Sequence, residues 1–174
     1  MVADLMGQET LLNHLFDALA CISAPRYYKS ERGFQGALLG ELAKRIPEGL
    51  LDGAIIEQEY QKRLLHHGVT IRPDVIVHEP FDERRHESRS EANLLVMELK
   101  LMADEKRAVA DLESLTAMID VLAYKAAAFI NIGSDETFQH LIPENYRERI
   151  VCFAVDLVDG KARVARSEFG PTGP

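Results

Sequence analysis

The chain has 174 residues, of which 47% are hydrophobic and 28% charged, a composition typical of a soluble globular protein. This length can bury a core without disulfides, so the sequence predicts one domain over 1–174, with its core at about 30–133 and a loose tail at 168–174. The net charge of −8 argues against a protein that binds nucleic acid by charge alone, because lysine and arginine supply that binding. It does not exclude a local basic face.

The first apolar run, at 11–22, predicts an amphipathic helix rather than a leader peptide or a membrane span. It is too short and too often interrupted by polar residues to cross a bilayer. We therefore expect a cytoplasmic protein that makes no contact with membranes. Cys21 and Cys152 lack metal-ligand spacing, and we interpret both as buried small apolar residues. The apolar positions at helical spacing are Leu12, Leu15, Phe16 and Leu19.

A second helix is predicted from Ser30 to Ile46, where apolar residues again recur at helical spacing. Ser30 can cap it, and Glu31 then lies in its first turn. Glycine is unfavourable inside a helix, so the three glycines of this segment predict that another element approaches closely. They are Gly33, Gly36 and Gly40.

Three strands are predicted next, the first two forming a hairpin. The run 54–63 partly alternates in polarity, a turn follows at His66-His67-Gly68, and 71–77 forms the second strand. The segment 79–91 is dense in charge and is predicted to be an exposed connection. The third strand covers 93–99.

The second half of the chain predicts a crossover helix over 105–118 and a buried strand over 127–133. A short helix near 134–140 precedes two final strands, 150–158 and 162–167, joined by a hairpin turn. The order helix, three strands, helix, strand predicts an α/β fold. It has a central mixed sheet flanked by helices, an extra N-terminal helix and a C-terminal strand pair.

The candidate site lies where two of these strands carry charge. Asp74 begins one strand, and Glu98 and Lys100 end the next; residues two apart in a strand share a face. If the two strands pair, the carboxylates can reach one ion. Hard cations such as Mg²⁺ or Mn²⁺ take oxygen ligands, so we predict a metal site made of Asp74, Glu98 and the backbone carbonyl of Leu99.

Lys100 and Glu31 are predicted to complete this site. A lysine beside two carboxylates can orient an attacking water or stabilise charge that develops during phosphodiester hydrolysis. Glu31 can add a carboxylate through the water shell of the metal. A helix N-terminus also favours an acid for its own electrostatic reasons, so both interpretations of Glu31 stay open.

The content and order of these segments resemble the PD-(D/E)XK nuclease superfamily, the restriction-endonuclease-like fold. The resemblance covers about 31–133 and implies an αβββαβ core. It also implies a metal-dependent nuclease with Asp74, Glu98 and Lys100 as signature residues and Glu31 as the acid that the superfamily often carries on a helix. The matching segments are 72–78, 93–100, 111–115, Tyr124-Lys125 and 129–133.

The predicted substrate is nucleic acid, with DNA favoured over RNA, and the protein acts as a homodimer or through a recruiting partner. The alternative is a catalytically inactive interaction module of the same fold, in a larger defence, repair or mobile-element assembly; the acidic charge motivates it. Arginines of the charged insert are interpreted as solvated, and Asp111 and Glu113 as helix surface. The predicted phosphate contacts are Lys29, Arg32, Lys62, Arg63 and Arg72.

Overall fold

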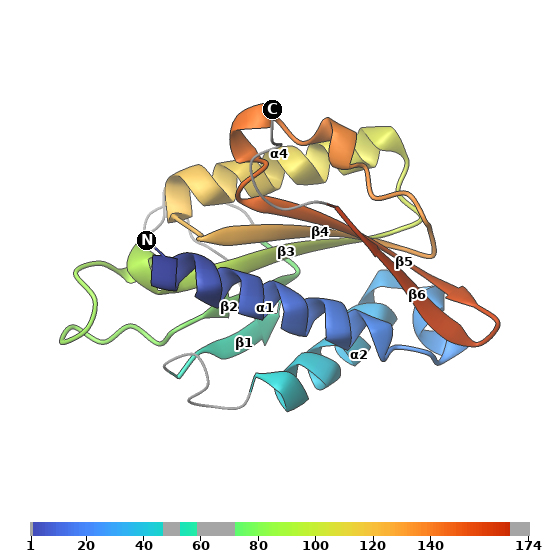
Figure 1. Ribbon diagram of the computed structural model, residues 1–174, viewed down its shortest axis with the longest axis horizontal. Coiled ribbons are helices and arrows are strands. Elements are labelled where there is room, and N and C mark those ends of the chain that lie inside the picture. Colours follow the sequence, from blue (N-terminus) through green and yellow to red (C-terminus); the bar gives the residue numbers. More distant parts are fainter. Residues whose placement is uncertain (1, 47–52, 59–71, 168–174) are drawn as a thin grey trace.

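A computed structural model describes residues 2–46, 53–58 and 72–167, which form one six-stranded sheet with helices on both faces (Figure 1). The helices are α1 (Val2–Ala20), α2 (Glu31–Arg45) and α4 (Glu105–Leu122). The strands are β1 (Ile55–Gln58), β2 (Val75–His78), β3 (Asn93–Leu101), β4 (Ala126–Ile132), β5 (Ile150–Val158) and β6 (Lys161–Arg166). Short 3₁₀ segments cover Pro25–Lys29, Arg89–Ala92, Gln139–Leu141 and Glu144–Tyr146.

The strands lie in the sheet in the order in which they follow one another along the chain. β1, β2 and β3 pair antiparallel, β3, β4 and β5 pair parallel, and β6 returns antiparallel to β5. α4 is the crossover between the parallel strands β3 and β4. The predicted α/β class and mixed sheet are confirmed, as is the order helix, three strands, helix, strand among the described residues.

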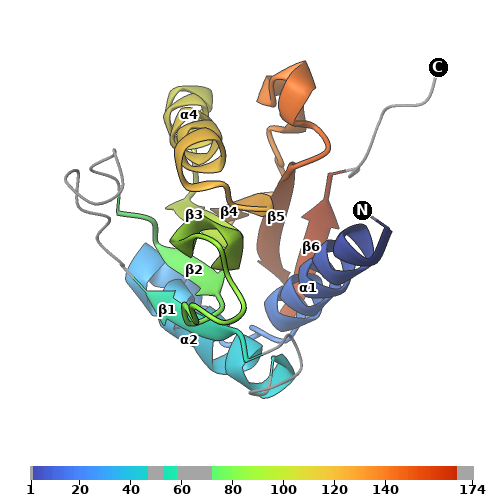
Figure 2. The same cartoon turned by 90° about the vertical axis from the view of Figure 1, so that its left-hand side faces the viewer.

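The two faces of the sheet have separate cores, because successive strand residues point to opposite sides. Val75 and Met97 face α1 and α2, whereas Ile76, Val96 and Phe129 face α4. Figure 2 shows the two layers, with α4 on one side of the sheet and α1 and α2 on the other. Asp74 lies two residues from Ile76, and Glu98 and Lys100 lie two and four residues from Val96, so all three belong to the face that α4 covers.

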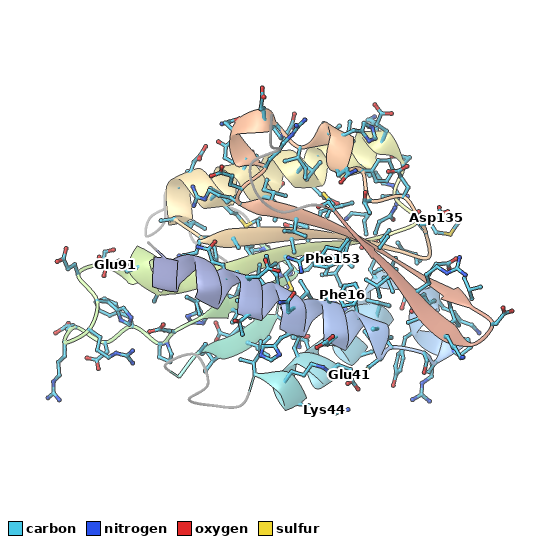
Figure 3. The ribbon with its side chains drawn as sticks, in the orientation of Figure 1. Phe16, Glu41, Lys44, Glu91, Asp135 and Phe153 are labelled. Carbon is cyan, nitrogen blue, oxygen red and sulfur yellow. The ribbon has the colours of Figure 1, made fainter. Side chains whose placement is uncertain are left out.

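α1 is fixed over the sheet by packing and by an ion pair. Leu12, Leu15 and Leu19 are fully buried, and Phe16 packs against the same core as Phe153, both labelled in Figure 3. Arg166 of β6 contacts the carboxylate of Glu9 at 3.0 Å. None of the helices in the described ranges has the length and apolar character needed to cross a membrane.

Several predictions about local structure are wrong. The segment 134–140 forms no α-helix; only the 3₁₀ turn Gln139–Leu141 is present. Cys21 is exposed, because it follows the last residue of α1, whereas Cys152 is buried as predicted. Among the described residues, no atom of another element lies within 4 Å of where a Cβ atom would stand on Gly36 or Gly40, and both glycines line a surface cavity of 290 Å³. The predicted turn at 66–68, the end of the strand 54–63 and the tail 168–174 lie outside the described residues.

Leu15→Ala is expected to lower the free energy of unfolding by about 2–5 kcal/mol, because Leu15 is fully buried between α1 and the sheet. Urea unfolding followed by circular dichroism measures the change. Asp17→Ala, at an exposed position of the same helix, is the control and should change stability by less than about 0.5 kcal/mol. Equal losses in the two variants would contradict the assignment of the buried face of α1.

Candidate functional site

The pairing of β2 with β3 places Asp74 next to Glu98. Val75, the first residue of β2, pairs with Met97 in an antiparallel register, so Asp74, just before β2, lies opposite Glu98, which follows Met97 on β3. The Oδ2 atom of Asp74 accepts a hydrogen bond from the backbone N–H of Leu99 at 2.7 Å. The two carboxyl groups are close enough to interact, since the charge of Asp74 raises the pKa of Glu98. The structure therefore brings together the two predicted metal ligands.

The surroundings of Glu98 favour its protonated form at neutral pH. Glu98 is only 8% exposed. Its burial, the charge of Asp74 and the charge of Asp111 raise its pKa to about 9. Burial also raises the pKa of Asp74, although hydrogen bonds from Leu99 and Glu98 oppose that shift. A buried acid whose pKa is raised by a like charge is a recognised signal of a functional site.

Lys100 lies between two carboxylates that come from opposite faces of the sheet. Its Nζ atom is 3.5 Å from Oδ2 of Asp111 on α4 and 3.8 Å from Oε2 of Glu31 on α2. Burial lowers the pKa of Lys100, but the charges of Asp111, Glu31 and Asp74 raise it by more than burial lowers it. The net result is a raised pKa. The side chain of Lys100 is 22% exposed, so its ammonium is a charged, partly buried group beside the carboxyl pair.

The first turn of α2 brings Glu31 to the end of β3. Ser30 caps the helix, as predicted, by accepting a hydrogen bond from the N–H of Gly33 at 3.1 Å. Oε1 of Glu31 accepts a hydrogen bond from the backbone N–H of Leu101 at 3.3 Å. The side chain of Glu31 is thus used structurally and also contacts Lys100, so all four predicted catalytic residues gather at one end of β3.

Gln35 supports the site and was missed in the sequence. It lies one helical turn after Glu31 on α2, is 5% exposed, and donates from Nε2 to the backbone carbonyl of Asp74 at 2.6 Å. The sequence signal was present, because Gln35 is a polar residue next to Phe34 and four positions from Glu31. Gln35 anchors the start of β2 and so helps to fix Asp74.

Asp111 is the second missed residue, and its assignment to the helix surface is wrong. Its side chain is 17% exposed, and Oδ2 is buried without a hydrogen-bond partner among the described residues. Burial raises its pKa, whereas the charge of Lys100 lowers it. Asp111 faces the sheet because it follows Ala108 by three positions and precedes Leu115 by four, on the buried stripe of α4. Glu113 is exposed, as predicted.

A tightly bonded turn connects β3 to α4. Met102 has a positive φ of 47°, and its N–H donates to the carbonyl of Ile132 at 2.8 Å. Asn131, fully buried and paired in register with Lys100, accepts from the N–H of Ala103 at 2.9 Å. Arg107 donates to the backbone carbonyl of Met102. These bonds fix the end of β3, where Lys100 lies, relative to the first turn of α4.

The predicted phosphate contacts divide into described and undescribed residues. Lys29 and Arg32 are exposed and flank Ser30 and Glu31, and Arg72 is exposed two residues before Asp74. Lys62 and Arg63 lie outside the described residues.

The charged insert lies at the other end of the molecule. It leads into the start of β3, whereas the candidate site is at the end of that strand. In Figure 3, Glu91 of the insert and Asp135, which follows β4, lie at opposite ends. Arg84 and Arg85 are exposed there, as predicted for a solvated loop.

The candidate site offers a small set of hard oxygen donors. In the ranges that the structure describes, no three or more histidine, cysteine, aspartate or glutamate side chains are arranged to hold a metal ion. The two adjacent carboxylates of Asp74 and Glu98 nevertheless fit Mg²⁺ or Mn²⁺, because Mg²⁺ is often held by one or two carboxylates, water and substrate phosphate. A divalent cation bound there would favour the ionised form of Glu98.

Comparison of the chain with protein-family models, with curated proteins and with solved structures found no match.

Proposed function

We propose that the protein is a metal-dependent nuclease of the PD-(D/E)XK type that hydrolyses phosphodiester bonds, with DNA favoured over RNA. The observation that carries the proposal is the register of β2 and β3, which sets the carboxylate of Asp74 against that of Glu98 and leaves Lys100 on the same face. The order α2, β1, β2, β3, α4, β4 supports the restriction-endonuclease-like core that the sequence resemblance implies.

Each residue has a distinct task under this proposal. Asp74, Glu98 and the backbone carbonyl of Leu99 would hold Mg²⁺ or Mn²⁺. When bound, the metal would supply a Lewis acid and lower the pKa of a coordinated water. Lys100, which stays charged, stabilises the negative charge that develops on the phosphate or orients the attacking water. Glu31 holds the end of β3 through Leu101 and the ammonium of Lys100 through its other oxygen.

The substrate would approach the end of the molecule where Lys29, Arg32 and Arg72 are exposed. Phosphate contacts confined to one end are compatible with a net charge of −8, because steering by charge depends on the local distribution. A homodimer, or a partner protein that delivers the substrate, would compensate for the small number of such contacts.

A cleavage assay tests the proposal directly. The purified protein is incubated with single- and double-stranded DNA and RNA, each with Mg²⁺, with Mn²⁺ and with a chelator. Metal-dependent cleavage of any substrate that is lost in Glu98→Gln supports the nuclease. Failure to cleave any of them, together with failure to bind Mn²⁺, would favour the inactive interaction module instead.

Asp74→Asn is expected to abolish Mn²⁺ binding measured by isothermal titration calorimetry. The amide can still accept the hydrogen bond from Leu99, so the fold should survive while the charged ligand is lost. Mn²⁺ should also raise the melting temperature of the wild type, by mass action, and leave that of the variant unchanged. Asp17→Asn, at an exposed position of α1, is the matched control and should bind like the wild type. Unaltered Mn²⁺ binding by Asp74→Asn would refute this ligand assignment.

A further inference from the structure

Asp111 contributes a carboxylate that the proposed chemistry does not use. It comes from α4, across the sheet from α2, and its Oδ2 atom lies 3.5 Å from the Nζ atom of Lys100. That oxygen is buried, and no hydrogen bond satisfies it among the residues described, so its ion pair with Lys100 is what compensates for its loss of water. A helix surface position would not need such a partner.

Lys100 needs an anchor because its side chain is long and flexible. Four carbon atoms separate the ammonium from the strand, and Asp74 of the Asp74–Glu98 pair attracts it as well as Asp111 and Glu31. An ammonium that settled on that pair would neutralise it and occupy the place of a divalent cation. Groups that hold the Lys100 ammonium elsewhere therefore leave the Asp74–Glu98 pair free to bind a cation.

Asp111 is the better buried of the two anchors. Its side chain is 17% exposed, against 42% for Glu31, and attraction between charges is screened less where water is excluded. Glu31 also divides its carboxylate between Lys100 and the N–H of Leu101. Asp111 has no second cation or hydrogen bond on Oδ2 in the described ranges, so that oxygen is dedicated to Lys100.

Resting on the proposed function, we propose that Asp111 is a positioning residue that holds the Lys100 ammonium away from the Asp74–Glu98 pair and so leaves the pair open to a metal ion. Its effect on metal binding is exerted through Lys100. Removing Asp111 lets the ammonium compete with the metal, and removing Lys100 as well abolishes that competition.

A double-mutant cycle on Mn²⁺ affinity tests this coupling. The four proteins are the wild type, Asp111→Asn, Lys100→Met and the double variant, each titrated calorimetrically with Mn²⁺. Asp111→Asn should weaken Mn²⁺ binding about tenfold in the wild-type background, the scale of residues that orient metal ligands, and less than about twofold in the Lys100→Met background. Glu113→Gln, at an exposed position of the same helix, should leave the affinity unchanged.

The outcomes separate this inference from the proposed function. Equal weakening in both backgrounds would mean that Asp111 acts by its charge or by supporting the fold, and would overturn its role through Lys100. Unchanged affinity in Asp111→Asn would overturn that role as well. A wild type that binds no Mn²⁺ would refute the proposed function itself and this inference with it, whereas wild-type binding without coupling refutes the inference alone.

Discussion

Lys100→Met is expected to lower the rate of metal-dependent cleavage by about 10²–10³-fold, the usual loss when one group that stabilises transition-state charge is removed. Methionine keeps much of the length and apolar bulk of lysine but has no charge. Lys100 is 22% exposed and lies at the end of β3, so the fold should survive the substitution, with a loss of stability because the buried Oδ2 of Asp111 loses its partner. Mn²⁺ should still bind, because Lys100 repels the metal rather than holding it.

Two measurements isolate this effect. Single-turnover cleavage at saturating metal and substrate gives the rate of the chemical step, and calorimetry gives the Mn²⁺ affinity. Lys44→Met, on the exposed end of α2 labelled in Figure 3, is the matched control and should cleave at the wild-type rate. Cleavage at the wild-type rate by Lys100→Met would exclude Lys100 from the proposed mechanism. Loss of both cleavage and Mn²⁺ binding would instead indicate damage to the whole site.

The central carboxyl pair could be predicted from the sequence because strand geometry is regular. Glu98 and Lys100 alternate with Leu99, and the structure buries Leu99 on one face and Glu98 on the other. To predict that Asp74 lies close to Glu98, it was enough to assume that neighbouring strands pair antiparallel, as β2 and β3 do. Short-range periodicity and one topological assumption were therefore enough to bring these residues together.

Asp111 and Gln35 were missed because the sequence does not show which polar position on a helix faces a polar site. Both lie on buried helical stripes, Asp111 before Leu112 and Gln35 after Phe34. A buried stripe is normally filled by apolar residues, so a carboxylate or an amide within it signals a partner across the interface. The identity of that partner, Lys100 or the backbone of Asp74, depends on packing of the helices on the sheet.

The errors at Cys21 and at 134–140 have a different origin. Cys21 continues an apolar periodic run, but α1 ends one residue before it, and a helix end is set by local geometry that periodicity does not report. The segment 134–140 is held by hydrogen bonds that replace a helix. The side chain of Asn131 donates to the carbonyl of Glu136, and Glu136 accepts from the N–H of Phe138. A pattern of apolar residues does not reveal such local side-chain hydrogen bonds.

Glu98→Gln is expected to stabilise the metal-free protein, and the gain should increase with pH. In the folded protein the pKa of Glu98 is about 9, whereas its ordinary value is 4.5. Below the ordinary value both folded and unfolded chains hold the proton, so the substitution has little effect. Above it the unfolded chain releases the proton and the folded chain keeps it, so folding of the wild type weakens by up to about 1.4 kcal/mol per pH unit until the folded group also ionises.

Urea unfolding in the presence of a chelator, at pH values from about 5 to about 8, measures this difference. The free energies of unfolding of the two proteins should be close at the acidic end and differ by several kcal/mol at the alkaline end, since glutamine mimics the protonated acid without titrating. Mn²⁺ should then stabilise the wild type more at high pH, because a carboxylate must lose its proton to bind the metal. Parallel stability curves would contradict the burial of an ionisable Glu98 beside Asp74, since only a group with different pKa values in the two states can make the curves diverge.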